Sequence, residues 1–182
     1  MFRPFMPNAL LCDMPTGGME GEACTCGVMI FSRGKTIVSA EKEITDLMNL
    51  YCTAIDSGDL KTFARLFANA QWIAEGKVPG PESMNNMILY EDGTPRTKHV
   101  ITNLTLRIDE AEGIANSHCY VTVYQQTPDF PLQVIFAGDY YDAFSRGVDG
   151  WAFVKREIRN SLIGNMQAHL KVPSLTIPGA KP

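Results

Sequence analysis

The sequence predicts one α+β domain in which helices come first and an antiparallel sheet follows. Three observations support this fold class. Apolar residues recur at helical spacing between Ile44 and Ile55, and a second helical segment follows Gly58. After Gly93 the chain consists of long runs of β-favouring residues separated by short turn sequences. This order is typical of proteins whose helices pack against one face of an antiparallel sheet.

The first helix is expected to begin after Ser39 or Ala40 and to end at Ser57-Gly58. Glu41 and Glu43 lie in its first turn, where the helix dipole favours negative charge. Its apolar stripe consists of Ile44, Leu47, Met48, Tyr51, Ala54 and Ile55.

Two shorter helices are expected between the first helix and the sheet. Asp59 is a favourable cap for one of them. The inner face of this helix carries Leu60, Phe63, Leu66 and Phe67. A short strand then ends at Gly76, and Pro79-Gly80-Pro81 marks a loop. Residues 83–92 are expected to form the third helix.

Four long strands are expected in the second half of the chain. They span residues 99–109, 114–126, 132–144 and 150–160. Short connections rich in turn-forming residues join them, so neighbouring strands should be antiparallel.

The composition is ordinary for a globular protein, with 45% hydrophobic and 20% charged residues. The net charge of −4 argues against a nucleic-acid or anionic-membrane surface, because either normally needs a basic patch. No apolar run approaches the length of about 20 residues that a bilayer requires. The five cysteines lack metal or redox spacing, so we expect free thiols in a cytoplasmic protein.

Four local strings carry a family resemblance. They are Tyr51-x4-Asp56 with Gly58-Asp59, then residues 70–76 (AQWIAEG), then His99-x3-Asn103, and Asp149-Gly150-Trp151-x-Phe153. In order and spacing they resemble SnoaL-like members of the nuclear-transport-factor-2-like superfamily, over roughly residues 40–160, and are similar to the scytalone dehydratase-like group. The resemblance implies a cone-shaped α+β barrel, in which a strongly curved antiparallel sheet and three N-terminal helices enclose an apolar pocket.

The resemblance also implies a catalytic pair. In the relatives an aspartate at the end of the first helix pairs with a histidine on the first long strand, and the matching positions are Asp56 and His99. Tyr51 matches a tyrosine about one turn earlier. The relatives' second pocket residue on the next strand has no clear counterpart, and the spacing places Thr122 or Tyr124 there.

Such a pair suits proton transfer. A neutral imidazole accepts a proton from carbon or from a hydroxyl near pH 7. A carboxylate on its other ring nitrogen fixes the tautomer and stabilises the imidazolium, and Tyr51 would be an acid or an oxyanion donor. From the residues alone, Asp56 is better explained by bonding to the Ser57-Gly58 turn, and strict strand alternation places His99 on the less apolar face.

Six further side chains are expected to bind substrate in the pocket: Trp72, Asn103, Tyr120, Thr122, Tyr124 and Tyr140. The face of the strand that carries Tyr120 to Tyr124 would suit a subunit interface almost as well. For Arg156 and Asn160, on the last strand, a solvated edge is the simpler expectation.

The expected function is that of a cofactor-independent lyase or isomerase of the dehydratase type. Its ligand would be a small apolar or aromatic compound, and its substrate a cyclic hydroxylated or ketone compound. No phosphate-binding glycine loop, G-x-S-x-G string or paired histidines occur, so no cofactor or metal is expected. Two alternatives stay open: a non-catalytic partner like the β subunit of a ring-hydroxylating dioxygenase, and a small-ligand-binding protein.

The expected domain boundaries follow from these patterns. Residues 1–38, rich in Gly, Pro and Met, should be a poorly ordered leader, and the SnoaL-like domain should span 39–162. For residues 163–182 two arrangements stay open, a tail that covers the pocket and a loose tail. We expect a homodimer or homotrimer.

Overall fold

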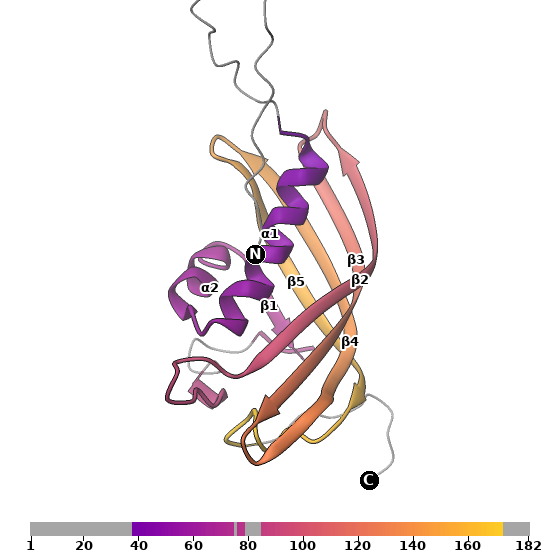
Figure 1. Cartoon of the computed structure of the whole chain (residues 1–182). Helices are drawn as coiled ribbons and strands as arrows, with labels where there is room; N and C mark the ends of the chain where they lie inside the picture. Colours follow the sequence, from indigo (N-terminus) through magenta and orange to yellow (C-terminus); the bar gives the residue numbers. More distant parts are fainter. Residues whose placement is uncertain (1–37, 75, 79–84, 173–182) are drawn as a thin grey trace, which may run out of the picture. The chain divides into compact units, whose positions relative to one another are not determined.

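The computed structural model describes residues 38–74, 76–78 and 85–172 (Figure 1). Apart from Val38, the leader expected over residues 1–38 lies outside the described residues. The elements are α1 (Ala40–Asp56), α2 (Leu60–Leu66), β1 (Gln71–Ala74), β2 (Thr97–Asp109), β3 (Ile114–Thr127), β4 (Phe130–Gly147) and β5 (Gly150–Ile163). This order of helices followed by a curved sheet confirms the predicted α+β class.

Helix α1 begins and ends where its sequence predicts. The Ser39 hydroxyl accepts a hydrogen bond from the Lys42 backbone N–H at 3.2 Å. After Ser57 the chain turns through Gly58, whose φ of +72° is in the left-handed region. A Cβ atom at Gly58 would lie 2.1 Å from the Gly93 carbonyl oxygen, so only glycine fits this turn. The turn leaves Asp56, the last residue of α1, close to the start of β2.

The described part of segment 83–92 does not form the predicted third helix. Asn85 and Asn86 are in 3₁₀ conformation, and from Met87 the chain runs without helix to a turn at Glu91. Its backbone hydrogen bonds go to the C-terminal segment instead: the Ile88 N–H donates to the His169 carbonyl at 2.8 Å. Asparagine is a weak helix former, and these long-range bonds outweigh the local preference.

The sheet has the strand order β1-β5-β4-β3-β2. Strands β2 to β5 form the predicted antiparallel meander. The short strand β1 is the exception, because it pairs with β5 in parallel, with Gln71 opposite Lys155. The sheet is therefore mixed at one edge, where a fully antiparallel sheet was expected.

A bulge in β2 decides which side chains face inward. Asn103 and Leu104 together lie opposite a single position of β3. Asn103 has a φ of +55°, a conformation that asparagine tolerates better than most residues. The extra residue reverses the alternation of faces. The four β2 side chains that are partly buried on the core side are His99, Ile101, Leu106 and Ile108. Strict alternation, which placed His99 on the less apolar face, was therefore wrong.

The core lies between α1 and the inner face of the sheet (Figure 1). Its buried side chains include Ile44, Met48, Tyr51 and Ile55 of α1 and Cys119, Val121, Ile135 and Phe144 of the sheet. A large aliphatic or aromatic side chain that is fully buried contributes about 1.5–3 kcal/mol. Tyr51 and Ile55, in the last turns of α1, also line a cavity, so the packed core gives way to open space at this end of the helix.

Candidate functional site

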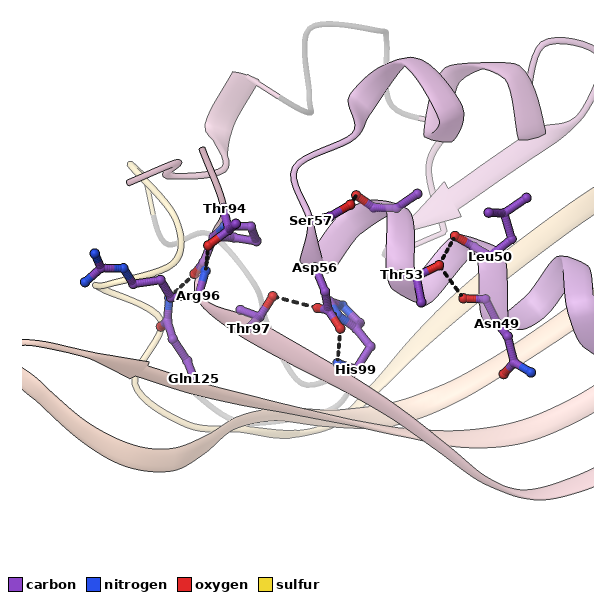
Figure 2. A network of polar contacts seen from close by, with 12 residues as sticks. Asn49, Leu50, Thr53, Asp56, Ser57, Thr94, Arg96, Thr97, His99 and Gln125 are labelled. Carbon is purple, nitrogen blue, oxygen red and sulfur yellow. Dashed lines mark hydrogen bonds and ion pairs between the residues drawn. The ribbon is translucent and has the colours of Figure 1, made fainter. Parts of the chain in front are cut away.

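Asp56 and His99 form a hydrogen-bonded pair between α1 and β2. The Asp56 Oδ1 atom lies 2.6 Å from His99 Nδ1. The same carboxylate accepts hydrogen bonds from the His99 backbone N–H and from the Thr97 hydroxyl, each at 2.8 Å (Figure 2). The two side chains are only 7% (Asp56) and 8% (His99) exposed. Three contacts from one strand therefore fix the orientation of the Asp56 carboxylate.

The environment of Asp56 favours its ionised form. Burial alone would raise the pKa of this carboxyl, but the hydrogen bonds and charge of His99, with the Thr97 hydroxyl, outweigh burial and lower the pKa. An ionised carboxylate only accepts hydrogen bonds, so the proton between the two side chains resides on His99 Nδ1. In the neutral ring, Nε2 is then the proton acceptor.

A cavity of about 160 Å³ lies beside this pair. Its wall is mostly apolar, with side chains that include Ile55, Val123, Ile135, Phe136, Ile158 and Leu170. Six polar or amphipathic side chains interrupt the apolar wall: Tyr51, Trp72, His99, Tyr140, Asn160 and His169. An apolar chamber with a few polar groups is the usual form of a small-molecule site.

Tyr51 lies next to His99 in the cavity wall. The two rings meet edge to face, with their centroids 6.4 Å apart. The guanidinium of Arg156 stacks on the Tyr51 ring, 4.1 Å from its centroid. Burial raises the pKa of the Tyr51 phenol, and the positive charge of Arg156 offsets this only in part. The hydroxyl is therefore a neutral hydrogen-bond donor at physiological pH.

Trp72 and Tyr140 also line the cavity, where the sequence analysis expected them. The indole Nε1–H of Trp72 is buried beside the Tyr51 hydroxyl and lowers the pKa of that phenol, although the contact is outside standard hydrogen-bond geometry. Because an indole nitrogen only donates, this group would satisfy an acceptor on a bound ligand.

Four of the expected substrate-binding residues do not line the cavity. Tyr120 and Tyr124 are 48% and 37% exposed, and with Thr122 they lie on the outer face of β3. The inner face carries Val121 and Val123, since aliphatic β-branched side chains fill the core in preference to polar aromatic ones. Asn103 is exposed in the β2 bulge. Neither Thr122 nor Tyr124 therefore takes the place of a second pocket residue.

Arg156 is buried rather than on a solvated edge. Its guanidinium donates to Asp142 through Nε at 2.8 Å and through a second nitrogen at 2.6 Å, and both side chains are 0% exposed. Asp142 and Arg156 are direct neighbours across β4 and β5. Opposite charges at matching positions of two adjacent strands are a signal of such a pair, but it becomes readable only once the strand register is known. Asn160, also expected at a solvated edge, is buried and lines the cavity.

The C-terminal segment completes the cavity wall, with Met166, His169 and Leu170. Sequence analysis did not identify His169 as a site residue. The segment shows no periodicity, and its place depends on contacts with residues 86–90 and Gln125.

The cysteines of the described region are structural. Cys52 and Cys119 are free and buried. Burial raises the pKa of Cys52 to about 11 and that of Cys119 to about 12, so neither is a reactive thiolate near neutral pH. Within the same region, no group of three or more His, Cys, Asp or Glu residues is arranged to hold a metal ion. None of the helices described is long and apolar enough to cross a membrane.

Comparison with known families gives a match over most of the chain. The family described as the SnoaL-like domain matches residues 36–157, which confirms the resemblance seen in the sequence. Comparison with curated proteins gives no match.

Solved structures share the fold. An NTF2-like protein with a cystatin-like fold from Novosphingobium aromaticivorans is 18% identical, with a TM-score of 0.56 over 71% of this chain and 86% of that one. A Mycobacterium tuberculosis protein of unknown function is 21% identical, with a TM-score of 0.54 over 66% and 70%. A proposed dehydratase of the NTF2-like family from Streptomyces avermitilis is 16% identical, with a TM-score of 0.52 over 68% and 97%. At these identities the similarity concerns the fold alone.

Proposed function

Because the chain belongs to the SnoaL-like domain family, and its Asp56–His99 pair borders an apolar cavity, we propose that it is a lyase or isomerase of the dehydratase type. It would act without a cofactor on a small cyclic hydroxylated or ketone compound. The observation that carries this proposal is the buried carboxylate bonded to His99 Nδ1, which leaves Nε2 as a base at the cavity wall.

His99 is the general base of the proposed reaction. Its Nε2 removes a proton from the carbon next to a carbonyl or from a substrate hydroxyl, and Asp56 stabilises the imidazolium that forms. In a dehydration the C–H electron pair becomes the new C=C bond, the C–O bond breaks, and the imidazolium returns the proton to the departing hydroxide. In an isomerisation the same proton returns to another carbon. Both reactions balance, because the proton that His99 removes returns either to the departing hydroxide or to another carbon of the substrate.

Tyr51 supports the reaction as a hydrogen-bond donor. Its raised pKa makes it a weak acid, so donation to an oxygen on which negative charge develops suits it better than full proton transfer. The Trp72 N–H, beside the Tyr51 hydroxyl, is a second donor at the same wall. In an apolar cavity such donors stabilise charge more strongly than they would in water.

The same site argues against the two non-catalytic alternatives. The carboxylate gives His99 a fixed tautomer at the cavity wall, which supports proton transfer more than passive binding. Titratable groups in such an environment cluster at functional sites. Isolation from the native source provides a further test, because an iron–sulfur α subunit should co-purify if the dioxygenase alternative is right.

The decisive experiment compares two histidine–aspartate pairs of one chain. Cyclic β-hydroxyketones would be incubated with the protein, and the conjugated enone product followed by ultraviolet absorbance. We expect His99→Ala and Asp56→Asn to lower kcat about 10²- to 10⁴-fold. His118 and Asp139 form a similar pair on the outer face, with 2.7 Å between Nε2 and Oδ1, so His118→Ala and Asp139→Asn are matched controls.

Equal rates for the wild type and the His99 and Asp56 variants would contradict the proposed function. So would a loss of activity in the outer pair as large as that in the inner pair.

A further inference from the structure

Among the residues that the structure describes, His169 is the one histidine of the three without a carboxylate partner. His99 is bonded to Asp56 and His118 to Asp139. His169 lies in the C-terminal segment, beyond the last residue of the family match, and its side chain lines the same cavity as His99. The mechanism proposed above makes no use of it.

The backbone around His169 is held firmly in place. The His169 carbonyl accepts a hydrogen bond from the Ile88 N–H at 2.8 Å. The carbonyl of the preceding residue, Ala168, accepts from the Tyr90 hydroxyl at 2.7 Å and from Gln125 Nε2 at 2.9 Å. These contacts, from two separate parts of the chain, fix where the imidazole enters the cavity.

The His169 ring nonetheless has an unsatisfied nitrogen. Nδ1 is buried, and no group in the described ranges forms a hydrogen bond with it. A buried polar atom of this kind is rare in native proteins and points to a missing partner. Because the ring borders the cavity, a bound molecule is the group best placed to supply that partner.

The charge state of His169 defines what kind of partner this is. Burial, with the nearby charge of His99, lowers its pKa to about 4, although Asp56 acts in the opposite direction. A neutral imidazole has one N–H donor and one acceptor nitrogen. It is therefore neither an ion-pair partner nor a strong acid, but it binds a hydroxyl or a carbonyl oxygen well.

The cavity volume suits a ligand with one ring. An apolar cavity of about 150 Å³ in another protein binds benzene, and the volume here is about 160 Å³. One six-membered ring therefore fits this space.

We propose that His169 is a substrate-binding residue, which holds an oxygen substituent of a single-ring substrate beside the atoms on which His99 acts. The inference rests on the proposed function only for the role of His99. Binding through His169 is measurable without turnover.

Phenol and benzene form a suitable pair of probes, because they differ by one hydroxyl. Titrations of the ¹⁵N-labelled full-length chain at pH 7 would follow the imidazole nitrogens by NMR. We expect phenol, and not benzene, to shift the ¹⁵N resonances of His169. Phenol should also bind about threefold to tenfold more tightly than benzene, as expected for one neutral hydrogen bond.

Three variants make this test specific. His169→Phe keeps the ring volume and should reduce the advantage of phenol. His169→Asn places an amide near the position of Nδ1 and should keep part of it, which also covers the case of a poorly folded phenylalanine variant. His118→Phe, on the outer face, should leave the affinities for phenol and benzene unchanged. Equal binding of the two probes to wild type, or a phenol advantage as large in His169→Phe as in wild type, would overturn the inference.

The outcomes separate this inference from the proposed function. If His99→Ala abolishes turnover while phenol binds equally well to wild type and to His169→Phe, the proposed function stands and the role of His169 falls. If His169 binds phenol but no compound turns over, the role of His169 stands and the lyase or isomerase proposal falls.

Discussion

Asp56 accepts two hydrogen bonds from the same residue, His99, which lies 43 positions further along the chain. One comes from the imidazole Nδ1 at 2.6 Å and the other from the backbone N–H at 2.8 Å. The carboxylate therefore fixes both the ring and the strand that carries it. This double contact couples the stability of the junction between α1 and β2 to the geometry of the candidate base.

The first prediction concerns acid stability. The pKa of Asp56 is lower in the folded protein than its value of about 3.9 in an unfolded chain. Just below that value the unfolded state binds the proton more readily, so the free energy of unfolding falls as the pH decreases through this range. The stabilisation is fully present above about pH 4. Asp56→Asn should therefore be less stable at pH 7, by about 1–3 kcal/mol, and should lose less stability on acidification.

Urea denaturation between pH 7 and pH 3 measures this effect. Asp46→Asn, on the exposed side of α1 in an ion pair with Lys42, controls for the loss of one carboxylate. Parallel pH profiles for wild type and Asp56→Asn would contradict the prediction.

The second prediction concerns the buried Asp142–Arg156 pair. Removal of one partner leaves the other charge buried and uncompensated, which typically costs about 3–5 kcal/mol. Arg156→Met should therefore lower the free energy of unfolding by this amount, and Asp142→Leu should do so similarly. The double variant should be more stable than either single variant, because no unpaired charge remains.

A double-mutant cycle in guanidinium chloride would measure the coupling between these two residues. Lys155→Met changes the neighbouring charge on a partly exposed side chain and should be nearly neutral. Strict additivity of the two single variants would show that the pair is not coupled.

The elements of the fold were predictable because their signals are local. Caps and apolar spacing define α1 and α2, and alternation with short turns defines the four long strands. The failed third helix shows the limit of such signals, since Asn86 and Ile88 form backbone hydrogen bonds with the C-terminal segment. Only the three-dimensional structure reveals that competition.

The candidate site was predictable only in part. The sequence predicted Asp56 and His99 as site residues through a family resemblance, whereas strand alternation placed His99 on the wrong face of the sheet. The Asn103 bulge explains this failure, because one extra residue moves every following side chain to the other face. Inward-facing residues of β3 were also misassigned, since Tyr120 and Val121 fit a strand equally well by propensity.

The third prediction tests the bulge itself. Asn103 adopts a left-handed conformation, with a φ of +55°. Asn103→Gly should therefore be tolerated, whereas Asn103→Val should cost about 1–2 kcal/mol, since a β-branched side chain clashes with the backbone there. If the valine variant straightens the strand, the register around His99 changes and activity falls with stability. Thr105→Val, an exposed position of the same strand outside the bulge, is the control.

Thermal unfolding of the three Asn103 and Thr105 variants, followed by circular dichroism, checks this ranking. An Asn103→Val protein as stable as Asn103→Gly would show that the left-handed conformation is not required.

The fourth prediction concerns the outer face of the sheet. Four exposed hydrophobic or aromatic side chains lie there on adjacent strands: Val100, Tyr120, Tyr124 and Val134. A cluster of this kind on the solvent side of a sheet is typical of a protein contact. We propose that a second copy of the chain covers it in a homodimer or homotrimer.

Tyr120→Asp combined with Val134→Lys should then produce a monomer, because charges buried in an apolar contact are unfavourable. Light scattering coupled to size-exclusion chromatography measures the mass, and Val148→Asp, in the fully exposed turn between β4 and β5, should leave it unchanged. A monomeric wild-type protein, or a double variant that stays oligomeric, would contradict the contact.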